Sequence, residues 1–148
     1  MYSIANIRTH LAKGGFDQDF CAIHSRTRCD ESNTRLAKLL DWMEESFNPE
    51  YSQIASAPGR TELGGNHTDH NHGRVLAAAV NLDCLSIFSP ASDPNDQTIT
   101  ILSENFEKPI VVDLSNTAPR PKEEGTSESI IRGVADEFRK AGFKASGF

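Results

Sequence analysis

The sequence has few of the residues that crosslink or anchor a chain, with three cysteines, one tryptophan and two tyrosines in 148 residues. Cys21, Cys29 and Cys84 show no C-x-x-C spacing, so we expect three free thiols in a reducing compartment, Cys84 being a small buried hydrophobe. No stretch approaches the roughly 20 apolar residues that a membrane span requires, and no apolar signal-peptide core begins the chain. These absences predict a cytosolic protein with no membrane partner.

Clusters of basic residues are also missing. Lys and Arg number 15 against 21 Asp and Glu, which gives a formal charge of −6. A nucleic-acid binder needs a basic face to neutralise phosphates, so this balance argues against a nucleic-acid partner. What remains is typical of one soluble domain, with 37% hydrophobic and 24% charged residues and enough length to bury a core without crosslinks.

Apolar residues recur at helical spacing near both ends of the chain. In the middle of the chain they alternate with polar residues or form continuous apolar runs, as in strands. We expect helices over residues 3–13, between Asn33 and Pro49, and from a Ser127 cap to Gly142, the last with Ile130, Ile131, Val134 and Phe138 as its buried face. Strands are expected over residues 52–57, 75–88, 98–102 and 109–114. The last two would form a hairpin, and the polar residues of the 75–88 strand would mark a bulge at Asn81 and Asp83. This order predicts an α+β fold.

Residues 57–73 are the stretch richest in chemical side chains, with four glycines, three histidines, two carboxylates, two asparagines and one arginine. We expect a polar loop over 59–73. By composition alone, the stretch could also be an ordinary surface turn with no binding role. A metal site at His67, Asp69, His70 and His72 is possible by ligand type, but the spacing does not favour it. A P-loop fails because Gly65-Asn66 stands where Lys-Ser/Thr is required. Recognition of sugar hydroxyls by Arg60, Asn66, His67 and Asp69 also fits the donors and acceptors present.

The same stretch resembles the signature motif of galactokinases, which are members of the GHMP small-molecule kinase superfamily. The family pattern is P-G-R-x-N/E-L-x-G-E-H-T-D-Y-N-x-G, and this chain matches it without a gap at Pro58-Gly59-Arg60, Leu63, Gly65, His67-Thr68-Asp69, Asn71 and Gly73. The resemblance covers most of residues 33–148, with residues 1–32 as a weakly determined N-terminal extension. It implies part of the N-terminal, sugar-binding domain of that superfamily, with helices on one face of a mixed or antiparallel sheet.

The resemblance also implies an activity, the ATP-dependent phosphorylation of galactose or a related sugar at its anomeric hydroxyl, with Mg²⁺. Arg60 would lie beside the reacting hydroxyl as the catalytic residue, where its permanent charge stabilises the transferring phosphoryl group. Asn66, His67 and Asp69, together with Arg60, would bind the sugar. No protein-held metal site is expected, and the residues that bind ATP are unknown because the family's phosphate loop is absent.

Several departures from the family pattern leave alternatives open. Asn66 replaces the family's glutamate, His70 replaces its tyrosine, and Ser127, Ile130 and Gly133 stand where family members often carry W-x-x-Y-x-x-G. We expect the chain to be an N-terminal fragment that is incomplete at its C-terminus, inactive alone and prone to self-association through an open sheet edge. A sugar-sensing relative that binds without turnover is the main alternative, and a globular domain with a merely polar loop is another.

Overall fold

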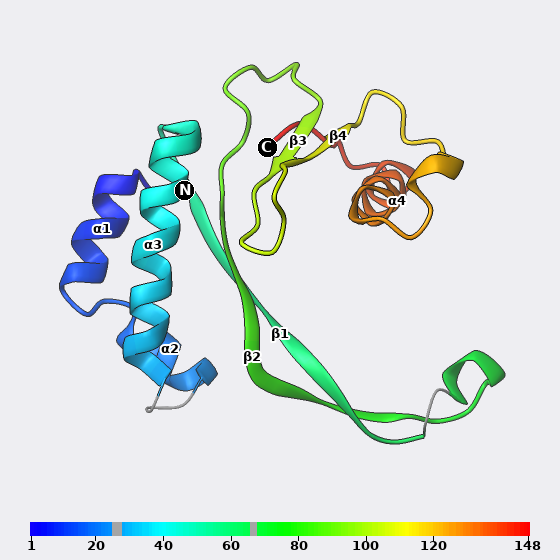
Figure 1. The fold of residues 1–148 in the computed structure, drawn as a ribbon, viewed down its shortest axis with the longest axis horizontal. Helices are drawn as coiled ribbons and strands as arrows, with labels where there is room; N and C mark the ends of the chain where they lie inside the picture. Colours follow the sequence, from blue (N-terminus) through cyan, green and yellow to red (C-terminus); the bar gives the residue numbers. More distant parts are fainter. Residues whose placement is uncertain (25–27, 66–67) are drawn as a thin grey trace. The chain divides into compact units, whose positions relative to one another are not determined.

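A computed structural model of the chain describes residues 1–24, 28–65 and 68–148 (Figure 1). Its helices are α1 (Ile4–Ala12), α2 (Asp17–His24), α3 (Cys29–Phe47) and α4 (Ser127–Lys140), with two 3-10 turns, η2 (Thr68–Asn71) and η3 (Pro121–Glu123). Its strands are β1 (Gln53–Gly64), β2 (Leu76–Phe88), β3 (Thr98–Ile101) and β4 (Ile110–Asp113). The predicted α+β class is confirmed.

The chain divides into two compact units, Met1–Phe88 and Ser89–Phe148. In the described residues each unit holds its own two-stranded antiparallel sheet, β1–β2 in the first and β3–β4 in the second. The expected antiparallel pairing and α+β composition are present, with the strands in two sheets rather than one. Because each hairpin closes its hydrogen bonds locally, neither one needs the other to pair its strands.

Three helices build the core of the first unit. The expected helix over 3–13 is confirmed as α1, in which Ser3 accepts a hydrogen bond from the Asn6 amide. Gly14 follows α1 at φ 69°, a left-handed conformation that suits glycine and ends the helix. The second expected helix is confirmed as α3 but begins earlier, at Cys29, and α2 was not predicted. Leu36 and Leu40 of α3 are fully buried at the centre of this core.

The β1–β2 hairpin is longer and more exposed than expected. We call residues 53–58 with 83–88 the hairpin base, and residues 60–64 with 76–79 the distal half. Residues 59–64, expected as loop, continue β1, because β2 supplies hydrogen-bonding partners as far as the pair Gly64–Leu76. The expectation of a buried strand over 75–88 is wrong. Leu85 is the one buried residue of β2, because only the hairpin base packs on the helical core.

The predicted bulge is present at the boundary between these two halves. Pro58 pairs with Asp83 and the next pair is Arg60 with Ala79, so β2 has extra residues opposite Gly59. A Cβ on Gly59 would approach the Val80 side chain to 3.1 Å, so glycine suits the crowding here. The polar residues in an apolar run therefore indicated the bulge correctly.

The second unit confirms the predicted hairpin and corrects the predicted helix face. β3 and β4 pair antiparallel, with Ile99 opposite Val112. The buried α4 residues are Arg132 and Ala135. Of the expected core residues, Ile131 is partly buried against this core, whereas Ile130, Val134 and Phe138 are exposed. Helix α4 begins at Ser127, with Thr126 rather than Ser127 at the N-cap, and Gly142 follows its end at φ 87°.

The burial of Arg132 has a clear physical cause. Its guanidinium donates to both carboxylate oxygens of Glu123 at 2.8 and 2.9 Å, and to the carbonyls of Asp113 and Asn116 at 2.7 Å each. A buried arginine is stable when its donors are satisfied in this way, so it takes the inward face of the helix despite its charge.

The cysteine prediction is wrong on two counts. Cys21 and Cys29 form a disulfide that joins α2 to α3, because the helices bring their Cα atoms to 5.3 Å. Cys84 is a free thiol but is exposed rather than buried, since it lies on the outward face of β2. None of the helices in the described residues is long and apolar enough to span a membrane.

Candidate functional site

Of the described motif residues, Arg60 to Gly64 lie in the distal half of β1, and Thr68–Asn71 form η2 between β1 and β2 (Figure 1). The Thr68 amide donates to the Gly65 carbonyl at 3.1 Å, and the Gly73 amide donates to the Thr68 carbonyl at 2.7 Å. Gly65 has φ 108°, and a Cβ there would lie 2.6 Å from the Arg74 carbonyl oxygen; a Cβ on Gly73 would collide with Thr68. These glycines allow the chain to fold back on itself in a tight, polar turn.

Arg60 lies in the distal half of β1, opposite Ala79, and is exposed. Within the described part of the chain no hydrogen bond or ion pair engages its guanidinium. Arg74, after the turn, is likewise without a partner among the described residues. Six other described arginines have one: Arg8 contacts Asp41 and Glu44, Arg28 contacts Glu31, Arg35 contacts Asp83, Arg120 and Arg132 contact Glu123, and Arg139 contacts Gln97. An unpaired arginine fork suits an anionic or hydroxyl-rich ligand, because its donors remain available.

The other predicted site residues are only partly covered by the structure. Asn66 and His67 lie outside the described residues. Asp69 is placed by its backbone in η2, and its side chain is not described. The polar pocket expected among Arg60, His67 and Asp69 therefore remains a prediction. In the described residues, no three His, Cys, Asp or Glu side chains are grouped to hold a metal ion.

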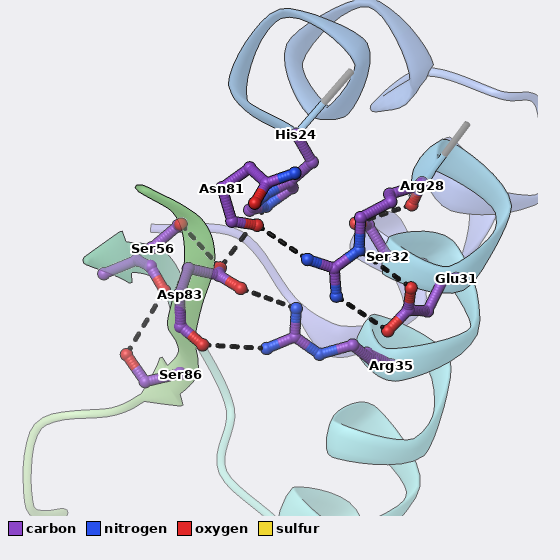
Figure 2. A network of polar contacts seen from close by, with 10 residues as sticks. His24, Arg28, Glu31, Ser32, Arg35, Ser56, Asn81, Asp83 and Ser86 are labelled. Atoms are coloured by element: carbon purple, nitrogen blue, oxygen red, sulfur yellow. Dashed lines mark hydrogen bonds and ion pairs between the residues drawn. The ribbon is translucent and has the colours of Figure 1, made fainter. Parts of the chain in front are cut away.

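A second group of polar residues lies at the hairpin base, and Figure 2 shows its contacts. The Asp83 carboxylate accepts a 2.6 Å bond from Arg35 Nη1 and a 2.7 Å bond from Ser56 Oγ. His24 Nε2 lies 3.4 Å from Asp83 Oδ2. The Asp83 and His24 side chains are 1% and 2% exposed, so this carboxylate is a buried charge held by partners from β1, α2 and α3.

The hydrogen bonds around Asp83 also determine its ionisation. Burial alone would raise its pKa, but the hydrogen bonds from Ser56 and Arg35 and the charge of Arg35 outweigh burial. The pKa of Asp83 therefore lies below its ordinary value, and the residue is ionised near neutral pH. Burying the Asp83 charge destabilises the fold little while its hydrogen-bonding partners are present, and strongly if one of them is removed.

A neighbouring contact fixes the backbone of the bulge itself. Arg28 Nη1 donates to the Asn81 carbonyl at 2.7 Å, while the rest of its guanidinium makes two 2.9 Å bonds to Glu31. Figure 2 shows Arg35 of α3 and Arg28, the residue that precedes α3, both directed at the β2 segment from Asn81 to Asp83. The sequence pattern indicated the bulge but not these partners, because they lie far away along the chain.

Comparison with known proteins agrees with the motif. A family model described as the galactokinase galactose-binding signature matches residues 44–90. A galactokinase of Bos taurus is 35% identical over 116 residues, which cover 74% of this chain and 29% of that protein. A galactokinase of Staphylococcus carnosus is 41% identical over 80 residues, 54% of this chain and 20% of its own length. No solved structure matches significantly.

The signature and these relatives show which class of protein the chain resembles, the sugar kinases. More narrowly, it is similar to galactokinases and is consistent with an N-terminal portion of one. The chain spans 29% or less of the length of these relatives. The matched residues 44–90 contain the motif and also Asp83 with its partner Ser56, whereas Arg35 and His24 lie outside the match.

Proposed function

We propose that this chain supplies the sugar-binding part of a kinase that transfers the γ-phosphoryl group of ATP to the anomeric hydroxyl of galactose or a related sugar. The observation that carries the proposal is the gapless galactokinase motif from Pro58 to Gly73, presented on an exposed hairpin whose arginine has no partner among the described residues. The GHMP kinase fold over residues 33–148 is part of the same proposal.

Each motif residue has a role that fits its chemistry. Arg60 stabilises negative charge that develops around the reacting hydroxyl, because a guanidinium keeps its charge at any working pH. Asp69 accepts hydrogen bonds from sugar hydroxyls, and His67 and the Asn66 amide complete the set of donors and acceptors. The motif glycines allow the backbone to approach the sugar ring closely.

ATP and Mg²⁺ are proposed as the co-substrate and its counterion, bound by residues other than those of this motif. The sequence contains neither G-x-x-x-x-G-K-[ST] nor G-x-G-x-x-G, so no phosphate cradle of either kind is available. Phosphoryl transfer depends on positioning and charge neutralisation of the phosphates, and a sugar site alone does not provide them. We therefore propose that this chain, by itself, binds sugar but does not phosphorylate it.

Calorimetric titration of the chain with galactose tests the binding step. We expect saturable binding that Arg60→Ala and Asp69→Ala weaken about tenfold or more, as for loss of a charged hydrogen bond. Lys38→Ala removes an exposed charge from α3 and serves as the matched control, with unchanged affinity. Absence of saturable binding to galactose and related sugars would contradict the proposal, and sugar phosphate formed by the chain with ATP and Mg²⁺ would contradict its inactivity.

A regulatory protein that senses sugar without turnover is the second candidate. It is favoured by Asn66 and His70, which replace an acidic and an aromatic residue of the family motif. Growth of galactokinase-deficient cells on galactose separates the two candidates. Because the chain alone is proposed to be inactive, the experiment uses a longer protein that contains it. Rescue by that protein requires turnover and supports the kinase, whereas galactose binding by that protein without rescue supports the sensor.

A further inference from the structure

The bulge in the β1–β2 hairpin separates the part that packs on the helices from the part that carries the motif. The strand pairing shifts there, from Pro58 with Asp83 to Arg60 with Ala79. Pro58 has no N–H to donate to the sheet, so backbone pairing is weakened at this position. Side chains must therefore supply part of what holds the two strands in this register.

Asp83 and its partners supply that attachment. Its carboxylate accepts hydrogen bonds from Ser56 on the opposite strand and from Arg35 on α3, and Arg35 Nη2 also donates to the Asp83 carbonyl at 3.3 Å. Arg28 holds the carbonyl of Asn81, two residues earlier. Beside the bulge, β2 is thus tied to α3 through Arg35, and β1 is tied to β2 through Ser56, as Figure 2 shows.

The register of the distal half decides where Arg60 points. Side chains alternate between the two faces of a strand, so a slip of one residue would move Arg60 to the opposite face. The distal half has no buried residue that would resist such a slip, since β1 is exposed from Ala57 to Gly64. The turn beyond Gly64 and a second register shift between Glu62 and Gly64 constrain the register from one end of the distal half, and the bulge with the contacts that hold it constrains the register from the other.

We propose that Asp83, with Arg35 and Ser56, is a positioning residue for the sugar site: it locks the bulge opposite Gly59 and so determines the face of the hairpin on which Arg60 lies. The expected effect of Asp83 on sugar binding rests on the proposed function. The expected effect of Asp83 on the hairpin rests on the strand register alone. Asp83 itself touches no sugar; it acts through the backbone between Pro58 and Arg60.

The test combines galactose affinity with a direct measure of register in the chain. Nuclear Overhauser contacts between the backbones of Arg60 and Ala79 report the pairing. We expect Asp83→Asn to lose these contacts and to weaken galactose binding about tenfold, while the α1–α3 core keeps its spectrum. Arg35→Gln should behave likewise, and Arg35→Lys should recover part of the affinity because it keeps the charge. Lys38→Gln, on the same helix, should change neither readout.

Ser56→Ala is the milder variant if Asp83→Asn does not fold, because it removes one hydrogen bond and leaves the Arg35–Asp83 pair. It should weaken both the Arg60–Ala79 contacts and galactose binding, but less than Asp83→Asn does. A folded Asp83→Asn or Ser56→Ala protein with wild-type contacts and affinity would overturn the proposal. If the wild-type chain binds no sugar, the proposed function fails, and the Arg60–Ala79 contacts still decide whether Asp83 sets the register.

Discussion

The two halves of the β1–β2 hairpin differ in what holds them. The hairpin base packs Leu85 and, more partially, Ile54 and Ile87 against the helical core, and it contains the buried Asp83. The distal half has Leu63 and Leu76 each 63% exposed and carries Arg60 without a partner among the described residues. The residues that stabilise the hairpin and the residues of the motif are therefore separated along the same two strands.

This separation leaves the polar side chains of the motif accessible. A side chain that is hydrogen-bonded within the protein is not available to a ligand, so the sugar-binding role proposed for the motif is compatible with a hairpin that is attached at its base. The hairpin base provides that attachment, and the distal half keeps its side chains accessible.

The largest expected effect comes from the core beneath the hairpin base. Leu36 is fully buried, so Leu36→Ala should lower the free energy of unfolding by about 4 kcal/mol through lost burial and a cavity. Leu63→Ala in the distal half should change it by less than about 0.5 kcal/mol. Urea unfolding followed by circular dichroism measures both. Equal losses would mean that the distal half is also part of the stabilising core.

Removal of the disulfide should have the next largest effect. Cys21 and Cys29 are eight residues apart and connect the two helices that contact β2, and a loop of this length contributes about 2.5 kcal/mol in the chain-entropy estimate. Cys21→Ser, or addition of dithiothreitol, should lower the free energy of unfolding by that amount. Cys84→Ser is the matched control and should leave stability unchanged. A reductant-insensitive unfolding curve would argue against the crosslink.

Two glycines of the motif strand provide a smaller and sharper comparison. Gly59→Ala places a Cβ 3.1 Å from Val80 Cγ2 and should cost about 1 kcal/mol. Gly64→Ala meets nothing within 4 Å and should be neutral, or stabilise by about 0.5 kcal/mol by restricting the unfolded chain. Thermal melting measures the pair. The opposite ranking would show that the bulge does not constrain Gly59.

The smallest effect is the acid dependence contributed by Asp83. Because its folded pKa is lowered, ionised Asp83 stabilises the fold at pH values above its unfolded pKa of about 3.9, and this contribution is lost as pH falls through the folded pKa. The difference in unfolding free energy between wild type and Asp83→Asn should therefore shrink below about pH 4. A difference that is constant from pH 7 to pH 3 would contradict this assignment.

Local patterns predicted much of the fold. The spacing of Ile4 and Ile7 indicated α1, the two β-branched runs indicated the β3–β4 hairpin, and the polar residues of β2 indicated its bulge. In each case the signal lies within a few residues of the element that it predicts. Helix α4 shows the limit, because the spacing of Ile130, Val134 and Phe138 identified a helix but not the face that packs on the sheet.

The candidate site divides in the same way. The motif around Arg60 was recognisable because its residues are consecutive, and the family comparison agrees with it. The contacts of Asp83 were not predictable, because Arg35 lies 48 residues away and Ser56 lies 27 residues away along the chain. The periodicity of a single sequence does not predict a contact between residues this far apart.

The sequence by itself determined the chemistry of this protein, since residue types and their order in the motif decide which groups a ligand can meet. Only the tertiary structure decided which charges are buried, which cysteines join and which strand register presents Arg60. The physical reason is that burial and pairing depend on residues that are far apart in the sequence. These contacts contribute to stability only after folding has brought the residues together.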